Sequence, residues 1–322
     1  MKPDRRVLVV RLGAMGDVVH TLPAVASLKH SMPRSEITWV VESKWRPLLE
    51  GNPYINRVIV FDRSTLAGLR SAWRELRRER FDLAVDFQGL IKSALVAACA
   101  RPERLYGFDS KCAREAPAAW FYSSRVHSES VHRVDKYLDL AAGAGVTNPL
   151  KVFPVPQGRP EGELPRGEFV LACPSAGWGS KQWPIDSYAA LGARLRREFG
   201  ISLVLNGPSP IAVAGTESHS SGIAGLIDAT RRATAIVGVD SGPTHIAAAI
   251  GKPGVAIYGP TDPAVTGPYG KTFAVVRSPD AVTTYKRGTE PDASMRAITP
   301  GEVFEHLKTI FERQKAGVAS QV

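Results

Sequence analysis

Two loops of the chain carry polar residues at points where a predicted strand gives way to a helix. The first, RLGAMGDVVHTLP at residues 11–23, follows the apolar run of residues 7–10 and contains Asp17. A glycine loop in this position usually receives a phosphate at the helix N-terminus. The Asp17 carboxylate would repel a phosphate there, although it would stabilise the helix dipole. Asp17 therefore argues against phosphate binding by this loop, and capping the helix is the simplest role for Asp17.

The second loop, in VGVDSGPTHIAAAIGKP at residues 237–253, suits a phosphate better. Ser241 and Gly242 would present backbone N–H groups and a hydroxyl at the positive end of a helix, with Pro243 in its first turn. Gly242 would also allow a ligand to approach the backbone closely. Asp240 and His245 lie beside this turn. The alternative is a capping turn that carries His245 on its surface.

A further phosphate candidate is the loop CPSAGWGSKQWP at residues 173–184. Its glycines leave the backbone open, and Lys181 supplies a compact charge suited to a diphosphate. Trp178 and Trp183 are predicted to form walls of the site. A lysine in a glycine-rich loop is often only solvated, but two such loops from one sheet favour a shared ligand.

Short apolar runs rich in Val and Ile alternate with helical patterns, which indicates βαβ units and parallel sheets. In the first half the predicted strands are residues 6–12, 36–42, 57–62 and 83–87, and the predicted helices are 17–31, 66–80 and 89–100. In the second half the predicted strands are 168–173, 202–206, 235–239 and 254–258, and the helices are 186–199 and 243–250. Between the halves, residues 152–167 are dense in Pro and Gly and lack periodicity, as expected of a linker.

The sequence therefore predicts an α/β protein with two doubly wound, Rossmann-like domains that face a central cleft. The expected parts are a first domain at 1–151, the linker at 152–167, a second domain at 168–298, a helix at 299–315 and a disordered tail at 316–322.

Composition narrows the class of protein. The chain has 322 residues, of which 44% are hydrophobic and 22% are charged, and none of its apolar runs reaches the ~20 residues that span a bilayer. MKPDRR leads directly into a strand, so we expect a cytoplasmic protein. Cys99, Cys112 and Cys173 are too few and too scattered to predict a disulfide framework or a zinc site. The net charge of +10 lies mostly in residues 1–150, but no nucleic-acid-binding motif accompanies it, which argues against a nucleic-acid partner.

Six motifs, in this order along the chain, resemble the bacterial lipopolysaccharide heptosyltransferases, most closely heptosyltransferase I. They are MGDVVHTLPA at 15–24, DFQGLIKSA at 86–94, AREAPAAWFY at 113–122, SKQWP at 180–184, VDSGPTHIAAA at 239–249 and YGPTDPAVTGPYGK at 258–271. The resemblance implies a GT-B fold and transfer of L-glycero-D-manno-heptose from ADP-heptose to the Kdo region of a lipid A precursor. It also implies inversion at the anomeric carbon, no metal ion and no cofactor.

The resemblance gives Asp17 a further role, because in this family the aspartate of the MGD motif is the general base. The donor is then expected at Lys181, Asp240, Ser241, Gly242 and His245, where positive charge and N–H groups stabilise the departing diphosphate. Asp240 is expected to contact a sugar hydroxyl or to fix the loop.

Gln88, Lys92 and Arg114 stand in motifs of the first domain that are shared with the family. They are assigned to the acidic acceptor or to shaping its pocket. Lys92 and Arg114 have the alternative of being ordinary surface charges.

One segment departs from the family pattern. Family members usually have a glutamate about four residues after the glycine that ends the strand at 202–206, and this glutamate contacts the nucleoside. Here Ile211 has that spacing and the following connection is shorter, with Glu217 as a possible substitute. Other functions therefore stay open: transfer or epimerisation of another nucleotide sugar, or nonenzymatic binding of one. A nicotinamide oxidoreductase is not expected, since the first loop lacks G-x-G-x-x-G.

Residues 66–80, LAGLRSAWRELRRER, predict an amphipathic helix with five arginines. Its apolar positions Leu66, Leu69, Trp73 and Leu76 are expected to pack on the sheet. The arginines are either simply solvated or face the anionic inner-membrane surface in which a glycolipid acceptor lies. The protein would then be peripheral on the cytoplasmic face of that membrane.

Overall fold

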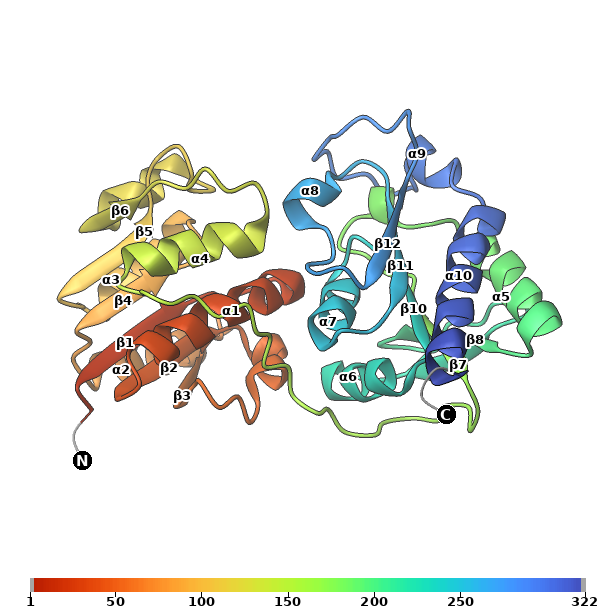
Figure 1. The fold of residues 1–322 in the computed structure, drawn as a ribbon. Helices are drawn as coiled ribbons and strands as arrows, with labels where there is room; N and C mark the ends of the chain where they lie inside the picture. The colour runs from red at the N-terminus through yellow and green to blue at the C-terminus, as the bar shows by residue number, and fades with distance from the viewer. Residues whose placement is uncertain (1–2, 320–322) are drawn as a thin grey trace. The chain divides into compact units, whose positions relative to one another are not determined.

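The computed structural model describes residues 3–319, with the surroundings of side chains described for residues 3–316. The chain divides into two compact units, unit 1 up to Pro156 and unit 2 from Gln157 onward (Figure 1). Within residues 3–319, none of the helices combines the length and the apolar character needed to cross a membrane.

Unit 1 is built on a parallel sheet of six strands in the order β3-β2-β1-β4-β5-β6. The strands are β1 Arg5–Val10, β2 Ser35–Val41, β3 Arg57–Val60, β4 Leu83–Asp86, β5 Arg104–Phe108 and β6 Ser124–Val126. The helices are α1 Met15–Ser31, η1 Ser43–Leu49, α2 Leu66–Arg77, α3 Ile91–Cys99, η2 Ala116–Phe121 and α4 Arg133–Gly143. Strands β1 and β4 are neighbours, and the strand order reverses between them. Ligands of doubly wound folds bind outside the carboxyl ends of the strands at this reversal.

Unit 2 repeats this plan, with a parallel sheet in the order β12-β11-β10-β7-β8-β9. Its strands are β7 Phe169–Cys173, β8 Ser202–Gly207, β9 Glu217–Ser220, β10 Ala235–Val239, β11 Gly254–Tyr258 and β12 Phe273–Arg277. Its helices are η3 Gly179–Lys181, α5 Ile185–Phe199, α6 Ile223–Arg232, α7 Gly242–Ile250, α8 Pro263–Thr266, α9 Ala293–Arg296 and α10 Pro300–Ala319. Here the order reverses between β7 and β10, and the two loops predicted to bind phosphate follow these strands.

The strands at the centre of both sheets are buried on both faces, which explains why they are continuous apolar runs instead of alternating ones. Residues 7–10 of β1 and the whole of β10 and β11 are buried. In unit 2, helices α5 and α10 pack together on the sheet, and Phe199 contacts Phe304 and Phe311 across their interface.

The predicted strands and helices of both halves are present, with their ends shifted by a few residues. Residues 152–167 contain no helix or strand, but Arg159 N–H donates to Ala224 O, so the second part of this segment packs on unit 2. Helix α10 continues to Ala319, whereas the sequence predicts a disordered tail from residue 316. Residues 320–322 of that predicted tail lie outside the described residues.

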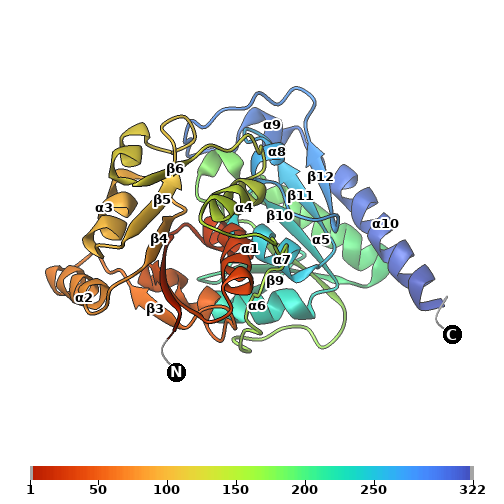
Figure 2. The ribbon, with the colours of Figure 1, turned by 60° about the vertical axis from the view of Figure 1, so that its left-hand side comes forward.

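Helix α2 differs from its prediction, because only Ala72 and Leu76 of its apolar positions are buried. Leu66 and Trp73 are 73% and 52% exposed, and Leu69 is also exposed. The helix lies beside the edge strand β3, where the sheet offers little surface to cover it (Figure 2). The expected apolar stripe is therefore mostly on the surface.

Candidate functional site

Asp17 lies in the first turn of α1, beyond the carboxyl end of β1 at the strand reversal of unit 1. Its neighbour Ala14, the residue before the helix, makes no side-chain cap. Gly13 is needed in this loop because a Cβ there would lie 2.5 Å from the Trp45 Nε1 atom. The loop is thus held tightly against its surroundings while the Asp17 side chain stays 19% exposed.

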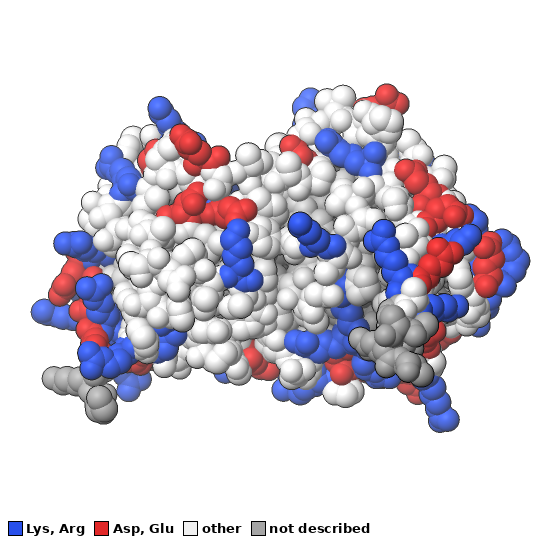
Figure 3. All heavy atoms as spheres, in the orientation of Figure 1, with Lys and Arg blue, Asp and Glu red and all other residues white. Residues whose placement is uncertain are grey.

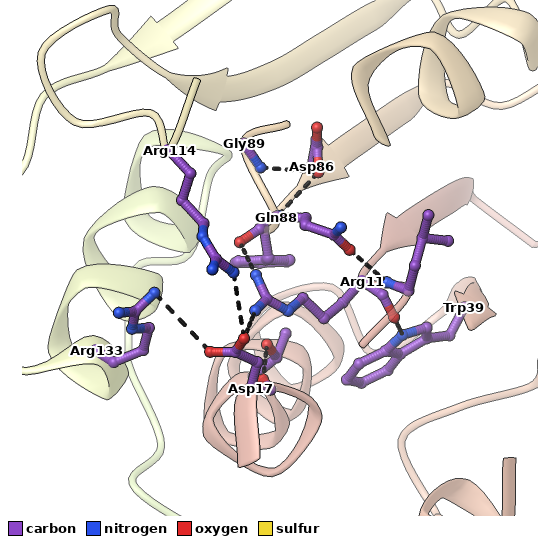
Figure 4. Close-up of polar contacts among 11 residues, drawn as sticks. Arg11, Asp17, Trp39, Asp86, Gln88, Gly89, Arg114 and Arg133 are labelled. Atoms are coloured by element: carbon purple, nitrogen blue, oxygen red, sulfur yellow. Dashed lines mark hydrogen bonds and ion pairs between the residues drawn. The ribbon is translucent and has the colours of Figure 1, made fainter. Parts of the chain in front are cut away.

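Three arginines point toward the Asp17 carboxylate (Figure 4). Arg11 Nη2 pairs with Oδ2, Arg114 Nη1 lies 3.4 Å from Oδ2, and Arg133 Nη1 lies 3.9 Å from Oδ1. They come from three places: the end of β1, the loop before η2, and the start of α4. Opposite charges at this range favour the ionised form of a carboxylate, which is the form that accepts a proton.

Arg11 is fully buried, which is uncommon for an arginine unless it is paired. Its Nη1 donates to Phe87 O at 2.8 Å, and its guanidinium lies 5.5 Å from the centre of the Tyr137 ring. Together with Asp17, these contacts satisfy the charge where water cannot reach it. Removing the Asp17 charge would leave Arg11 without its anion.

Gln88 is a buried residue in the loop after β4 and joins the two strands at the reversal. Its Oε1 accepts from Leu12 N–H at 2.9 Å, so its side chain is committed to the protein backbone. Its own N–H donates to Asp86 Oδ1 at 2.9 Å. Gln88 therefore ties the loop after β4 to the end of β1, and its assignment to the acceptor pocket stays a prediction.

The buried Asp86 carboxylate at the end of β4 holds this loop through hydrogen bonds. Burial raises the pKa of the Asp86 carboxyl, although hydrogen bonds from Ser93, from the Gln88 N–H and from Tyr122 oppose that shift. Tyr122 Oη donates to Oδ2 at 2.8 Å, and Ser93 Oγ donates to the same atom at 2.8 Å. The fully buried carboxylate has donors from the residue after η2, from α3 and from its own loop, and it holds this loop in place.

Lys92 and Arg114 differ in their placement. Arg114 reaches Asp17, as described above, while its backbone lies against Gly89, whose φ of +67° suits a glycine. Lys92 is exposed in the first turn of α3, and the structure shows no ion pair or hydrogen bond for it among the described residues. Arg114 is therefore part of the cluster around Asp17, and Lys92 is not.

In unit 2, Lys181 and Asp240 come from the loops after β7 and β10 and meet at the strand reversal. Lys181 Nζ lies 2.5 Å from Asp240 Oδ2, and His245 Nε2 lies 3.6 Å from Oδ1. Burial opposes ionisation of Asp240, but the His245 hydrogen bond and the Lys181 charge outweigh it and hold the pKa of the carboxyl well below its usual range. Asp240 is thus an ionised residue that fixes Lys181 and His245 in place.

Ser241 and Gly242 begin α7, as predicted, with Pro243 in its first turn. Ser241 is nearly buried, and its hydroxyl has no hydrogen-bond partner among the described residues. Thr244 packs against Gly238, where a Cβ would lie 2.1 Å from its Oγ1 atom. A helix N-terminus with a spare hydroxyl and a lysine beside it is suited to a phosphate.

The two predicted tryptophan walls behave differently. Trp178 is half-buried, with Lys181 Nζ 4.3 Å and the Arg287 guanidinium carbon 5.4 Å from its ring centre. Trp183 is instead a core residue, packed edge-on against Tyr188 and donating from Nε1 to Ile298 O at 2.9 Å. Trp183 packs in the core of unit 2 and also lines the cavity described in the next paragraph, so its place agrees with the prediction of a wall.

A cavity of about 580 Å³ lies beside this cluster at the same edge of the sheet. Its lining includes Ser175, Gln182, Ile211 and Pro291. Ile211 supplies an apolar wall at the position where the family has a glutamate. Glu217 cannot replace that glutamate, since it begins β9 opposite Val204 and binds Ser202 Oγ and Arg196.

Two residues of the cluster around Asp17 were missed from the sequence. Arg11 stands at the end of an apolar strand, where a charged residue is usually taken as the start of a loop. Arg133 begins α4, a helix that the sequence did not predict. The sequence signal that could have indicated a buried, paired Arg11 is its position between Val10 and Leu12, six residues before Asp17.

Several known proteins are similar to this chain in sequence and in fold. The model of glycosyltransferase family 9 (heptosyltransferase) matches residues 69–292. Lipopolysaccharide heptosyltransferase 1 of Escherichia coli K12 is 30% identical over 301 residues, covering 85% of this chain and 94% of that protein. The protein of the same name from Pseudomonas aeruginosa is 30% identical over 298 residues, and the alignment covers 83% of this chain and 82% of that protein.

Among solved structures, the E. coli heptosyltransferase WaaC with ADP is similar to this chain with a TM-score of 0.77 and 26% identity, over 95% of this chain and 99% of that one. These matches confirm the predicted α/β fold with two Rossmann-like units and the expectation of a glycosyltransferase. The chain belongs to glycosyltransferase family 9, the heptosyltransferase family.

Proposed function

We propose that the protein transfers L-glycero-D-manno-heptose from ADP-heptose to the Kdo region of a lipid A precursor, with inversion and without a metal ion at the reacting centre. The observation that carries this proposal is the Asp17 carboxylate held among three arginines at the strand reversal of unit 1. A carboxylate so placed is suited to take a proton from an acceptor that is itself anionic. Solved relatives with ADP and with ADP-2-deoxy-2-fluoro heptose support the choice of donor.

On the donor side, unit 2 supplies the groups that a departing diphosphate needs. Lys181, the N–H groups at the start of α7 and the Ser241 hydroxyl would bind the diphosphate and stabilise the charge that develops on it. The cavity lined by Ile211 is our candidate for the nucleoside. Asp240 holds the lysine and the histidine toward the ligand.

On the acceptor side, Asp17 Oδ would take the proton of the attacking hydroxyl as the sugar carbon gains oxocarbenium character. Arginines close to a carboxylate also lower its affinity for a proton. Carboxylate or phosphate groups of the acceptor would draw Arg114, which is 47% exposed, away from Asp17. Acceptor binding would thereby increase the basicity of Asp17 at the moment when a base is needed.

The direct test is incubation with ADP-heptose and a Kdo-bearing lipid A precursor, with products read by mass and the anomeric configuration read by NMR. We expect one added heptose per acceptor, release of ADP, inverted configuration and no requirement for added Mg²⁺ or Mn²⁺. Product from a UDP-sugar alone would favour another transferase, a changed donor sugar without transfer would favour an epimerase, and donor binding without turnover would favour a binding protein.

The exposed side chains of helix α2 and its neighbours support binding of the acceptor at a membrane surface. The helix exposes Trp73 beside Arg77, whose guanidinium lies 5.5 Å from the ring centre. Trp120 on η2 and Leu95 on α3 are also exposed. Exposed aromatic residues among arginines are typical of surfaces that lie against lipid headgroups.

Vesicle binding tests this surface. We expect salt-sensitive, reversible association with vesicles that contain anionic lipid, and none with neutral vesicles, because each basic residue near the surface adds about 1 kcal/mol of attraction. On the face shown in Figure 3, basic side chains lie along the left-hand edge of unit 1 with acidic ones between them, so the attraction is moderate. The test variant replaces four arginines of this helix and its end by Gln: Arg70, Arg74, Arg77 and Arg78.

This variant should sediment less with anionic vesicles and show a raised apparent KM for membrane-embedded acceptor, with unchanged affinity for ADP-heptose. A matched control removes four exposed charges from unit 2 by substitution to Gln: Arg196, Arg197, Lys308 and Arg313. Equal sedimentation of the α2 variant and the parent protein would show that this helix is only a solvated face.

A further inference from the structure

Strands β5 and β6 end side by side, and three metal-binding side chains follow them. Phe108 and Val126 are paired at the ends of these strands, so the next residues, Asp109 and His127, are neighbours. Asp109 then starts a tight turn in which Ala113 N–H donates to Asp109 O at 2.8 Å, and this turn carries Cys112. The sequence does not indicate this group, because Cys112 and His127 are 15 positions apart along the chain.

The three ligand atoms converge. Cys112 Sγ lies 3.6 Å and Asp109 Oδ2 lies 2.7 Å from the same atom, His127 Nδ1, and all three lie within 4.8 Å of one another. In tetrahedral zinc sites, with Zn–S of about 2.3 Å and Zn–N of about 2.0 Å, sulfur and nitrogen ligands are about 3.5 Å apart. The Cys112–His127 separation is close to this value, and the Asp109–His127 separation is about 0.5 Å shorter than the separation of oxygen and nitrogen ligands that are each about 2.0 Å from zinc.

The carboxylate is also oriented for this role. Asp109 Oδ1 accepts from the Cys112 N–H at 2.9 Å and from the Lys111 N–H at 3.1 Å, which leaves Oδ2 directed at the histidine. Such outer hydrogen bonds are what hold a ligating carboxylate in a metal site. His127 is half exposed and Asp109 and Cys112 are partly exposed, so a cation can enter from solvent.

We propose that Asp109, Cys112 and His127 form a binding site for a divalent zinc-type cation, with its fourth position open to water. A thiolate, an imidazole and a carboxylate together suit Zn²⁺ far better than Mg²⁺ or Ca²⁺, which prefer oxygen ligands. On binding, the neutral imidazole offers its Nδ1 lone pair to the cation with its one proton on Nε2, and the Cys112 thiol releases its proton to solvent. The proposal departs from the expectation that the cysteines are too scattered for a zinc site, and it does not depend on the donor or acceptor proposed above.

The site has a consequence for the cluster around Asp17. Cys112 precedes Arg114 by two residues in a turn whose geometry a bound cation would fix. Arg114 leaves this turn toward Asp17 Oδ2. Zinc would therefore reduce the freedom of the segment from which Arg114 reaches the candidate base.

Cobalt provides the test, since Co²⁺ bound to a thiolate has a near-ultraviolet charge-transfer band. The chelator-treated full chain should develop this band at one equivalent of Co²⁺, and Zn²⁺ should abolish it. Cys112→Ser should lose the band, and His127→Gln should weaken Zn²⁺ affinity by at least about 100-fold, the upper end of the effect of removing a mere outer-shell partner. The controls Cys99→Ser and His306→Gln alter exposed residues elsewhere and should bind as the parent does.

Thermal unfolding and amide exchange give readouts that do not involve activity. Zn²⁺ should raise the Tm of the parent and of Cys99→Ser, should leave the Tm of Cys112→Ser unchanged, and should slow amide exchange in residues 109–114 of the parent. Absence of the thiolate band in the parent, or a band that persists in Cys112→Ser, would overturn the proposal.

Discussion

Replacing Asp17 by Asn is expected to lower turnover by about 10²–10⁴-fold, the usual contribution of a general base, while binding of ADP-heptose is nearly unchanged. The structure adds a second effect. Arg11 is fully buried and pairs with Asp17, so the neutral amide leaves its charge uncompensated. Loss of one partner of a buried pair costs on the order of 3–5 kcal/mol, and the 19% exposure of Asp17 places the expected loss near the lower end.

The double variant Asp17→Asn with Arg11→Met separates these effects. Removing the buried charge should restore much of the free energy of unfolding, because the unpaired guanidinium is no longer present. Turnover should stay low, because the proton acceptor is still absent. Recovery of turnover together with stability would mean that Asp17 acts only by neutralising Arg11.

The Lys181→Ala variant is expected to weaken binding of ADP by roughly 1.5–3 kcal/mol, the worth of a hydrogen bond to a charged group. That range corresponds to about 10-fold to 150-fold in Kd, which calorimetry measures directly. The variant also takes from Asp240 the cation that lies 2.5 Å from its Oδ2, so some stability is lost at the same time.

A second variant keeps these contributions apart. Lys181→Ala with Asp240→Asn removes both charges and leaves no ionised carboxylate buried beside the start of α7. If Lys181 binds the diphosphate, this pair should be more stable than Lys181→Ala alone and should still bind ADP weakly. Unchanged ADP affinity in either folded variant would assign Lys181 to the support of Asp240 alone.

The sequence predicts the central strands well because burial on both faces makes them continuous apolar runs. It does not predict β5, β6, β9 or β12. For β6, SRV, and β9, ESHS, the reason is that three or four residues with few apolar side chains carry no pattern of their own. These strands exist because an edge of a sheet is already present beside them. Helices α4 and α6 were also missed, and with α4 the residue Arg133.

The residues of the candidate site likewise fall into those that local sequence patterns predict and those that they do not. Asp17, Lys181 and the Asp240-Ser241-Gly242 turn were found because each follows a recognisable strand within a motif. Arg11 and His127 were not, since their roles depend on which strand ends are neighbours. Parallel pairing of β5 with β6 creates the group around His127, and no local signal records that pairing.

The bond between the Gln88 side chain and Leu12 N–H affects how the free energy of the reaction is distributed. Because Arg11 also donates to Phe87 O, the ends of β1 and β4 are tied together beyond their own ladder. Groups held in this way need no reorganisation as charge moves during the reaction. With Asp17 as the proposed base, the reorganisation free energy would fall on Arg114 and Arg133, which reach Asp17 over longer distances from other segments and would be the adjustable part of the site.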